Sequence, residues 1–392
     1  MKTKTCSLVF RLALLAAILA SCAPKPAAPL QTPTPAPTTT WVVQPSLAYD
    51  TLGFFNALSG DPTYLSFYQK EYDQFYPQFN PEAQKALANL AAAKDEYHFV
   101  LSATLQLIYS VKDPQTLDDL IAMAHDPAPL QEPFLQSGIV PQKDILESWW
   151  PLVIALSPDI EKVLVALKNA GFEDYWQEKV SPAEQTLAEQ LQKDLFQYNV
   201  IEAVENTTGK SLSGAGPITV YVSYFNTPHG ARITGTRFIM ETRSPNVPLF
   251  VRTAVHELLH QPYDVNSQEF WDAIDTLQLD EYLMQRFEGQ TSSMGYKDWE
   301  GYVGESCTDG LEQVVSEKLG VAQPLSARFG QDEDENMHVL APAIYVLVKQ
   351  EGFPQNGETF SQFIVRMVKE EKLAPGKMEA LSNQFKAMQS AK

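Results

Sequence analysis

Basic residues, long apolar segments and internal repeats are all in short supply in this 392-residue sequence. Lysine and arginine number 29 against 48 acidic residues, which gives a formal net charge of −19. A chain this acidic repels phosphate backbones, so we expect no nucleic-acid partner. No apolar run after residue 40 is long enough to span a bilayer, and no repeat is visible, which argues against a membrane-spanning or repeat architecture for the body of the chain.

The only extended apolar run lies at the N-terminus, and it has the character of a targeting segment. Three basic residues precede a short apolar stretch at 12–19, a pattern typical of a secretory signal. The stretch ends in Leu-Ala-Ser-Cys at 19–22, which resembles a bacterial lipobox. This resemblance implies that residues 1–21 are a lipoprotein signal peptide and that Cys22 is lipidated. We therefore predict a protein outside the cytoplasm, held at the cell envelope through its N-terminal lipid alone.

Cysteine is also scarce, with three in the whole chain. Cys6 would be removed with the signal and Cys22 would be acylated, so Cys307 is left alone and no intramolecular disulfide is expected. Stability must then come from the burial of a hydrophobic core. Residues 22–40 are rich in proline, threonine and alanine, and we interpret them as an extended tether.

The remaining sequence predicts an α+β fold that is predominantly helical. Residues 41–180 have mainly helical periodicity and are predicted to form a helical N-terminal region. A second domain is predicted over 181–392, beginning with a helix at 182–206. Two segments rich in β-branched and aromatic residues, 218–225 and 232–241, predict strands of a small sheet.

Beyond Pro248 the pattern is helical again, and it contains the segment that carries the chemistry, His256-Glu257-Leu258-Leu259-His260. On a helix spanning 248–261, the two histidines would be about 40° apart and one turn along the same face. Two imidazoles at this spacing can hold one Zn²⁺ while the intervening glutamate takes a proton from water. Histidine occurs only six times in the chain, so a chance pairing in this motif is improbable.

A catalytic zinc ion needs a third protein ligand. The segment Gly304-Glu305-Ser306-Cys307-Thr308-Asp309 resembles the Glu-x-x-x-Asp motif of gluzincins, the thermolysin-like zinc peptidases. The resemblance implies that Glu305 binds zinc with His256 and His260, and that Asp309 orients a zinc-binding histidine. Glu281 is an alternative third ligand, although Gln285 stands four residues later where the motif has aspartate.

The same resemblance implies the rest of the site. Residues 181–392 would form a zincin-like metallopeptidase domain with one Zn²⁺, and Glu257 would be the general base in peptide-bond hydrolysis. The strand at 232–241 would border the cleft, and a helical insertion would cover roughly 267–290. His338 or Tyr345 would donate a hydrogen bond to the oxyanion.

Two other functions remain open from the sequence. The same ligands would serve a zinc hydrolase that cleaves a non-peptide amide in cell-wall material. Alternatively, the chain is a non-enzymatic surface-binding lipoprotein with a structural zinc ion. A structural site would have a fourth protein ligand in place of the open position.

Overall fold

The computed structural model describes residues 39–390, except 98, 141, 213–215, 229, 244–245, 261, 290–297 and 330–337. The predicted signal peptide, Cys22 and the tether up to residue 38 lie outside these described residues. Among the described helices, none is both long and apolar enough to cross a membrane. The predicted α+β class, mainly helical with a small sheet, is confirmed.

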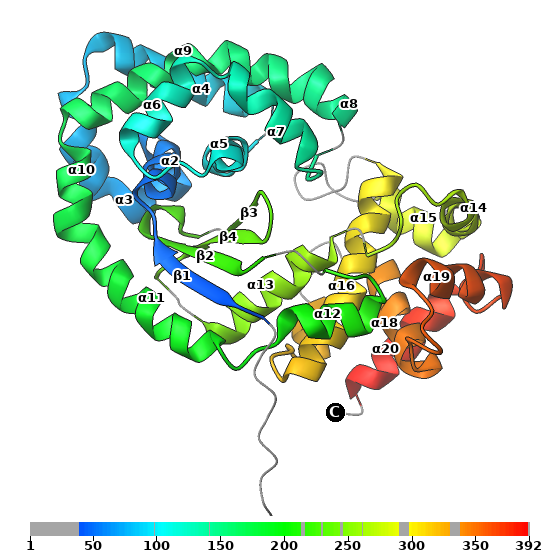
Figure 1. Cartoon of the computed structure of the whole chain (residues 1–392). Helices are drawn as coiled ribbons and strands as arrows, with labels where there is room; N and C mark the ends of the chain where they lie inside the picture. Colours follow the sequence, from blue (N-terminus) through cyan, green and yellow to red (C-terminus); the bar gives the residue numbers. More distant parts are fainter. Residues whose placement is uncertain are drawn as a thin grey trace, which may run out of the picture. The chain divides into compact units, whose positions relative to one another are not determined.

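A four-stranded mixed sheet lies between two groups of helices (Figure 1). Its strands, in spatial order, are β1 (Trp41–Pro45), β2 (Ile218–Ser223), β4 (Arg237–Glu241) and β3 (Ala231–Ile233). β1 and β4 run parallel to β2, and β3 runs antiparallel to β4 at the edge. The first strand comes from the N-terminal region that the sequence predicted as helical, and it pairs with β2 from Trp41 opposite Ile218 onward.

The segment predicted as a single strand at 232–241 is instead a hairpin. Gly235 has a φ of +74°, a conformation that glycine adopts without steric cost, and it reverses the chain between β3 and β4. Consequently β4 is an interior strand, and the three residues of β3 form the edge opposite β1.

Helices of the N-terminal half cover one face of the sheet. Their apolar side chains pack with Tyr221, Ile233 and Ile239 of the strands. These helices are α2 (Leu47–Leu58), α3 (Pro62–Phe75), α4 (Pro81–Tyr97), α5 (Leu101–Tyr109), α6 (Leu117–His125), α7 (Gln131–Gln136), α8 (Gln142–Asp144), α9 (Trp150–Asn169) and α10 (Phe172–Tyr175).

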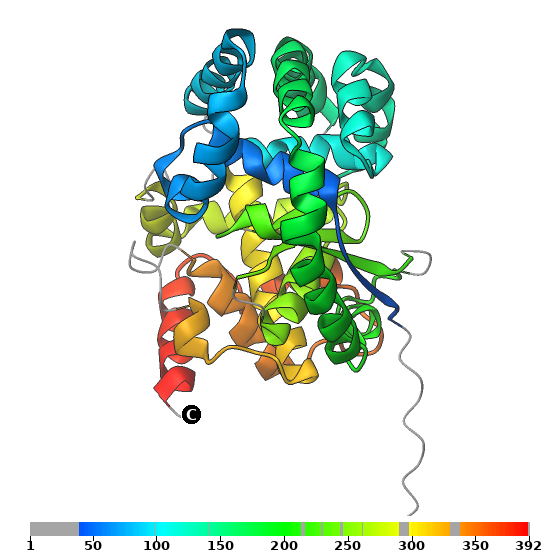
Figure 2. The ribbon, with the colours of Figure 1, turned by 90° about the vertical axis from the view of Figure 1, so that its left-hand side faces the viewer.

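Helices of the C-terminal half pack against the opposite face, through Val220, Val222 and Phe238. Figure 2 shows the sheet between these two helical groups. The second group comprises α12 (Val200–Thr208), α13 (Val247–Leu259), α14 (Gln268–Ile274), α15 (Glu281–Glu288), α16 (Trp299–Leu319), α17 (Leu325–Phe329), α18 (Leu340–Glu351), α19 (Phe360–Lys369) and α20 (Met378–Ser390). Because both groups share one sheet, residues 37–392 form a single compact unit.

The helix predicted at 182–206 is two helices, α11 (Ser181–Leu195) and α12, separated by four residues ending at Asn199. The break brings Asn199 against the first residues of the described chain, where its side-chain oxygen accepts hydrogen bonds from the backbone and hydroxyl of Thr39. A π-helical turn at Trp176–Val180 leads directly into α11, so Ser181 is the first residue of this helix and does not cap it.

Close packing of α16 fixes the position of the predicted third ligand. α16 lies against α18, and a Cβ atom added to Gly310 would come within 2.8 Å of the Ala341 carbonyl oxygen. A side chain at this position would force the two helices apart. At the other side of α16, the Thr308 hydroxyl donates to the Leu259 carbonyl at 3.3 Å and ties the helix to the end of α13.

Candidate metal centre

α13 presents one apolar and one polar face. The helix begins after Asn246, whose side chain accepts a hydrogen bond from the Leu249 backbone N–H, and Pro248 occupies its first turn. Val251, Ala254, Val255 and Leu259 are buried in the C-terminal core. The polar face is therefore held at a defined orientation toward α16.

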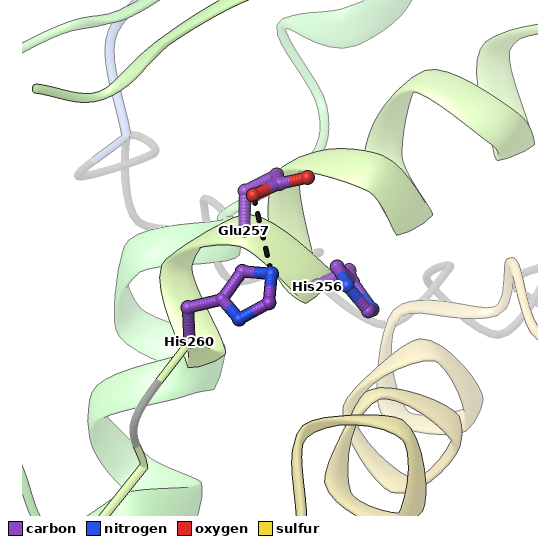
Figure 3. A group of neighbouring side chains, drawn as sticks. All are labelled: His256, Glu257 and His260. Carbon is purple, nitrogen blue, oxygen red and sulfur yellow. Dashed lines mark ion pairs between the residues drawn. The ribbon is translucent and has the colours of Figure 1, made fainter. Parts of the chain in front are cut away.

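His256 and Glu257 belong to this helix, but His260 lies one residue beyond its end. The backbone of His260 has φ −52° and ψ 124°, so the predicted helix at 248–261 stops two residues early. The two histidine rings nevertheless lie close, with centroids 4.8 Å apart and planes nearly perpendicular. Figure 3 shows Glu257 and His260 directed toward each other, with His260 Nε2 3.5 Å from Glu257 Oε2.

α16 brings Glu305 and Asp309 to the same place. Glu305 Oε2 is 3.6 Å from His256 Nε2, and Glu305 Oε1 is 3.6 Å from His260 Nδ1. Asp309 Oδ1 is 3.4 Å from the other ring nitrogen of His256, Nδ1. His256 thus has one nitrogen toward Glu305 and the other toward Asp309.

These distances suit a zinc site. Two ligand atoms about 2 Å from a tetrahedral zinc are about 3.3 Å from each other, close to the separations between Glu305 and the two histidines. The residues form two overlapping sets, in each of which one ligand atom per residue lies within 4.8 Å of the others. One set is His256, Glu257 and His260, and the other is His256, Glu305 and Asp309. His256 is common to both sets, and Glu305 contacts both histidines, so His256, His260 and Glu305 are the residues that would hold an ion, with Asp309 beside the His256 ring. These three do not by themselves form a set in which every ligand atom is within 4.8 Å of the others.

The charge of the cluster also suits a cation. Contacts of 4 Å or less join the histidines to Glu257, Glu305, Asp309 and Glu312, and join these acids to Arg232 and Arg328. With neutral histidines, four carboxylates face two guanidinium groups. Arg252 also lies near Glu312, which leaves an excess of one negative charge that still favours a cation.

The histidines differ in protonation because their surroundings differ. Burial opposes a charge on His256, but its contacts with Asp309 and Glu312 outweigh that cost and raise its pKa to about 10. Burial and the nearby charge of His256 lower the pKa of His260 to about 3. At neutral pH, His256 is thus the one charged histidine of the pair. Binding of a metal ion to His256 would release that proton to solvent.

The pKa values of the carboxyl groups also differ from one another because their surroundings differ. Burial raises the pKa of Glu257 above its ordinary value, and burial raises that of Glu305 to about 7. Burial would also raise the pKa of Asp309, but His256 and Arg328 lower it to about 2. Asp309 is therefore the permanently ionised member, which suits a group that orients a histidine.

A cavity of about 400 Å³ borders His256 and Glu257. Arg252 and Thr253 line it from α13, Glu312 from α16, and Arg328 from α17. Of the candidate ligands, His256 lies at the wall of this space, next to the candidate base Glu257, and the space is large enough for part of a substrate.

Two other predicted residues, Glu281 and Tyr345, lie apart from the candidate ligands, whereas His338 lies near Asp309. Glu281 is exposed at the start of α15, and among the described residues it makes no ion pair with a histidine. Tyr345 is fully buried, and its hydroxyl donates to Glu317 Oε1 at 2.7 Å. Glu317 is twelve residues beyond Glu305, about 18 Å along the same helix, so Tyr345 is not positioned as an oxyanion donor. His338 precedes α18, near enough to Asp309 for its charge to lower that pKa.

Two arginines that no sequence motif predicts also belong to the cluster. Arg328 of α17 bonds both Asp309 and Glu312, the latter at 2.7 Å from its Nη2. Arg232 approaches Glu257 from β3, and only the hairpin turn at Gly235 reveals that it faces α13. Comparisons with protein-family models, curated proteins and solved structures found no match.

Proposed function

We propose that the chain is a zinc-dependent peptidase that holds one Zn²⁺ through His256, His260 and Glu305 and cleaves peptides or proteins outside the cytoplasm. The observation that carries the proposal is the convergence of α13 and α16. It brings Glu305 within 3.6 Å of each histidine, places the half-buried Glu257 beside them, and leaves a cavity that His256 and Glu257 line.

Each residue has a role in amide hydrolysis. A zinc ion bound here would polarise the substrate carbonyl and make water more acidic. Glu257 accepts a proton from the attacking water while the new C–O bond forms, and its raised pKa improves it as a base. Glu257 then passes that proton to the leaving nitrogen as the C–N bond breaks.

Metal content of the purified chain tests the ligand set. We expect about one zinc per chain in the parent. Glu305→Gln should lose most of this zinc, whereas Glu281→Gln should retain all of it. Glu281→Gln is a matched control, because it makes the same substitution at an exposed glutamate outside the cluster. A parent that stays free of zinc when zinc is supplied would refute the proposal.

Activity is tested with a peptide library and a panel of non-peptide amides, with Glu257→Gln as the inactive variant. Cleavage of peptides by the parent alone supports a peptidase, whereas cleavage of the other amides alone supports the cell-wall alternative. Zinc bound without any hydrolysis supports a structural metal in a binding protein.

The proposed lipid anchor rests on the sequence at 19–22, and its test is separate. We expect the full chain to fractionate with membranes and Cys22→Ser to be released. Equal membrane association of the two proteins would refute the anchor without affecting the metal site.

A further inference from the structure

Arg252 of α13 lines the cavity beside His256 and Glu257, and it has no carboxylate partner of its own. Its Nη1 donates to the Val321 carbonyl oxygen at 2.9 Å, and this is its one hydrogen bond among the described residues. Over the same residues it makes no ion pair of 4 Å or less. Its Nε and Nη2 atoms have no partner there and are not fully buried, so a ligand in the cavity can reach them.

The charge of Arg252 is not neutralised within the fold. Glu312, which also lines the cavity, is bonded instead by Arg328, at 3.1 Å from Nε and 2.7 Å from Nη2. Burial lowers the pKa of Arg252; Glu312 opposes this shift and Arg328 adds to it. Arginine nevertheless stays protonated at any working pH, so the cavity presents a permanent positive charge. A divalent ion would more than cancel the single negative charge in excess across the neighbouring cluster, and the site would then favour an anion.

Helix geometry places this charge one turn from the candidate ligand His256. Arg252 precedes His256 by four residues on α13, so the two side chains share a face and are about 6 Å apart along the axis. Successive residues of an extended peptide are about 3.5 Å apart. A peptide whose scissile bond lies beside His256 and Glu257 would therefore place a group from an adjoining residue near Arg252. Leu249 and Ala327 line the same cavity and would contact the methylene groups of that residue.

We propose that Arg252 is a specificity-determining residue that binds a carboxylate of the substrate next to the scissile bond. This inference rests on the proposed hydrolysis and names its substrate class: peptides with an acidic side chain, or a free C-terminal carboxylate, at this position. The Nε–H and one Nη2–H of a guanidinium point the same way and match the two oxygens of a carboxylate. Because Val321 occupies Nη1, the edge that remains open is the one suited to this pairing.

Paired peptides test the inference by changing one group at a time. Each pair differs only in Glu or Gln at one of the two residues flanking the scissile bond, or only in a free or an amidated C-terminus. We expect the parent to cleave the carboxylate member of a pair with a kcat/KM about 10–100-fold higher, as charge-assisted hydrogen bonds provide. A preference for Glu over Gln identifies an acidic side chain as the bound group, whereas a preference for the free over the amidated peptide identifies the chain end.

Variants of Arg252 connect this preference to the guanidinium group. Arg252→Gln should bring the ratio of the two kcat/KM values close to one, and Arg252→Lys should retain part of the preference. The ratio is the readout, because a loss of stability or of zinc would lower both rates equally. Arg286→Gln is the matched control: Arg286 also donates from Nη1 to a backbone carbonyl at 2.9 Å, but it lies on α15 and does not line this cavity.

Peptide affinity gives a second readout that does not depend on turnover. In protein that carries Glu257→Gln, adding Arg252→Gln should weaken calorimetric binding of the carboxylate peptide by about 10–100-fold and leave the uncharged peptide unaffected. An active parent that cleaves both members of every pair equally would overturn this inference alone, as would a preference that survives in Arg252→Gln. A parent that hydrolyses none of the peptides would refute the proposed function and this inference together.

Discussion

Two groups of buried carboxyls in this fold differ in their partners. Asp50 of α2 and Glu184 of α11 meet near the end of β2. Asp50 accepts hydrogen bonds from Trp176 Nε1 at 2.7 Å, from the Ser223 hydroxyl at 2.6 Å and from the Phe225 backbone at 2.9 Å. All these donors are neutral and at normal hydrogen-bond lengths.

The carboxyls around α13 and α16 are arranged differently. Carboxylate oxygens of Glu305 and Asp309 lie 3.4–3.6 Å from ring nitrogens of His256, which is longer than a normal hydrogen bond. A cavity borders the group at His256. Asp50 is bonded by neutral donors of the protein, although Oε2 of its neighbour Glu184 is buried without a hydrogen-bond partner among the described residues. The α13–α16 group has space and charge for an ion. Burial alone therefore does not identify a functional carboxyl; the partners and the adjoining cavity do.

The strongest test applies one substitution to both groups. Glu257→Gln should reduce peptide hydrolysis by about 10²–10⁴-fold, the usual contribution of a general base. Glu184→Gln should leave hydrolysis unchanged, although it too replaces a buried glutamate whose pKa is raised. Initial rates at saturating substrate, corrected for zinc content, measure the difference. Equal losses would show that the glutamates matter only for folding.

The sequence could predict which candidate ligands share a helix, because their spacing follows from helix geometry. Glu305 and Asp309 are four residues apart on α16 and share a helix face whatever the tertiary fold. His256 and His260 have the same spacing and their rings lie close, although His260 is just beyond the end of α13. Arg328 and Arg232 could not be predicted this way. Their positions depend on α17 and on the hairpin between β3 and β4, both set by long-range packing.

In the fold, too, local features could be predicted from the sequence and long-range features could not. Helical periodicity predicted the mainly helical α+β class, and the helices predicted between 267 and 290 are present as α14 and α15. The pairing of β1 with β2 joins residues more than 170 positions apart, from Trp41 to Ile218, and no local pattern encodes it. The sequence predicts one strand where the structure has a hairpin, because the turn between β3 and β4 is only three residues long, Thr234 to Thr236.

Zinc itself should stabilise only through the α13–α16 group. A free zinc concentration 100 times the Kd should raise the free energy of unfolding by about 2.7 kcal/mol. Urea titrations with zinc and with a chelator measure this difference. We expect it to vanish in Glu305→Gln and to persist in Asp50→Asn. Stabilisation that survives Glu305→Gln would place the ion elsewhere.

Asp309 should affect zinc less than a direct ligand does. Asp309→Asn removes the charge facing His256 Nδ1, and loss of such an orienting group weakens metal binding by about 10–100-fold. Competition with a chromophoric chelator gives the zinc affinity. Asp50→Asn is the control, because Asp50 is also a buried hydrogen-bond acceptor but lies in the Asp50 group, away from the candidate metal site. An unchanged zinc affinity in Asp309→Asn would mean that Asp309 serves Arg328 alone.

The smallest effect concerns stability and pH in the Asp50 group. Burial and the neighbouring charge of Asp50 raise the pKa of Glu184 from 4.5 to about 11. The folded protein therefore keeps a proton that the unfolded chain releases above its ordinary pKa. The stability that this proton provides is complete below about pH 4.5 and declines as the pH rises toward 11.

Glu184→Gln removes that decline, because an amide does not ionise and its N–H can still donate to Asp50. We expect the variant to be more stable than the parent by about 1–3 kcal/mol at pH 9 and nearly equal to it at pH 5. Urea unfolding at both pH values measures this, with the exposed Glu189 of the same helix replaced by glutamine as the control. Because the α13–α16 group is unchanged in this variant, its zinc affinity should equal that of the parent. A parent whose stability falls no faster with pH than that of Glu184→Gln would show that Glu184 is ionised in the fold, and the contrast between the two carboxyl groups would then fail.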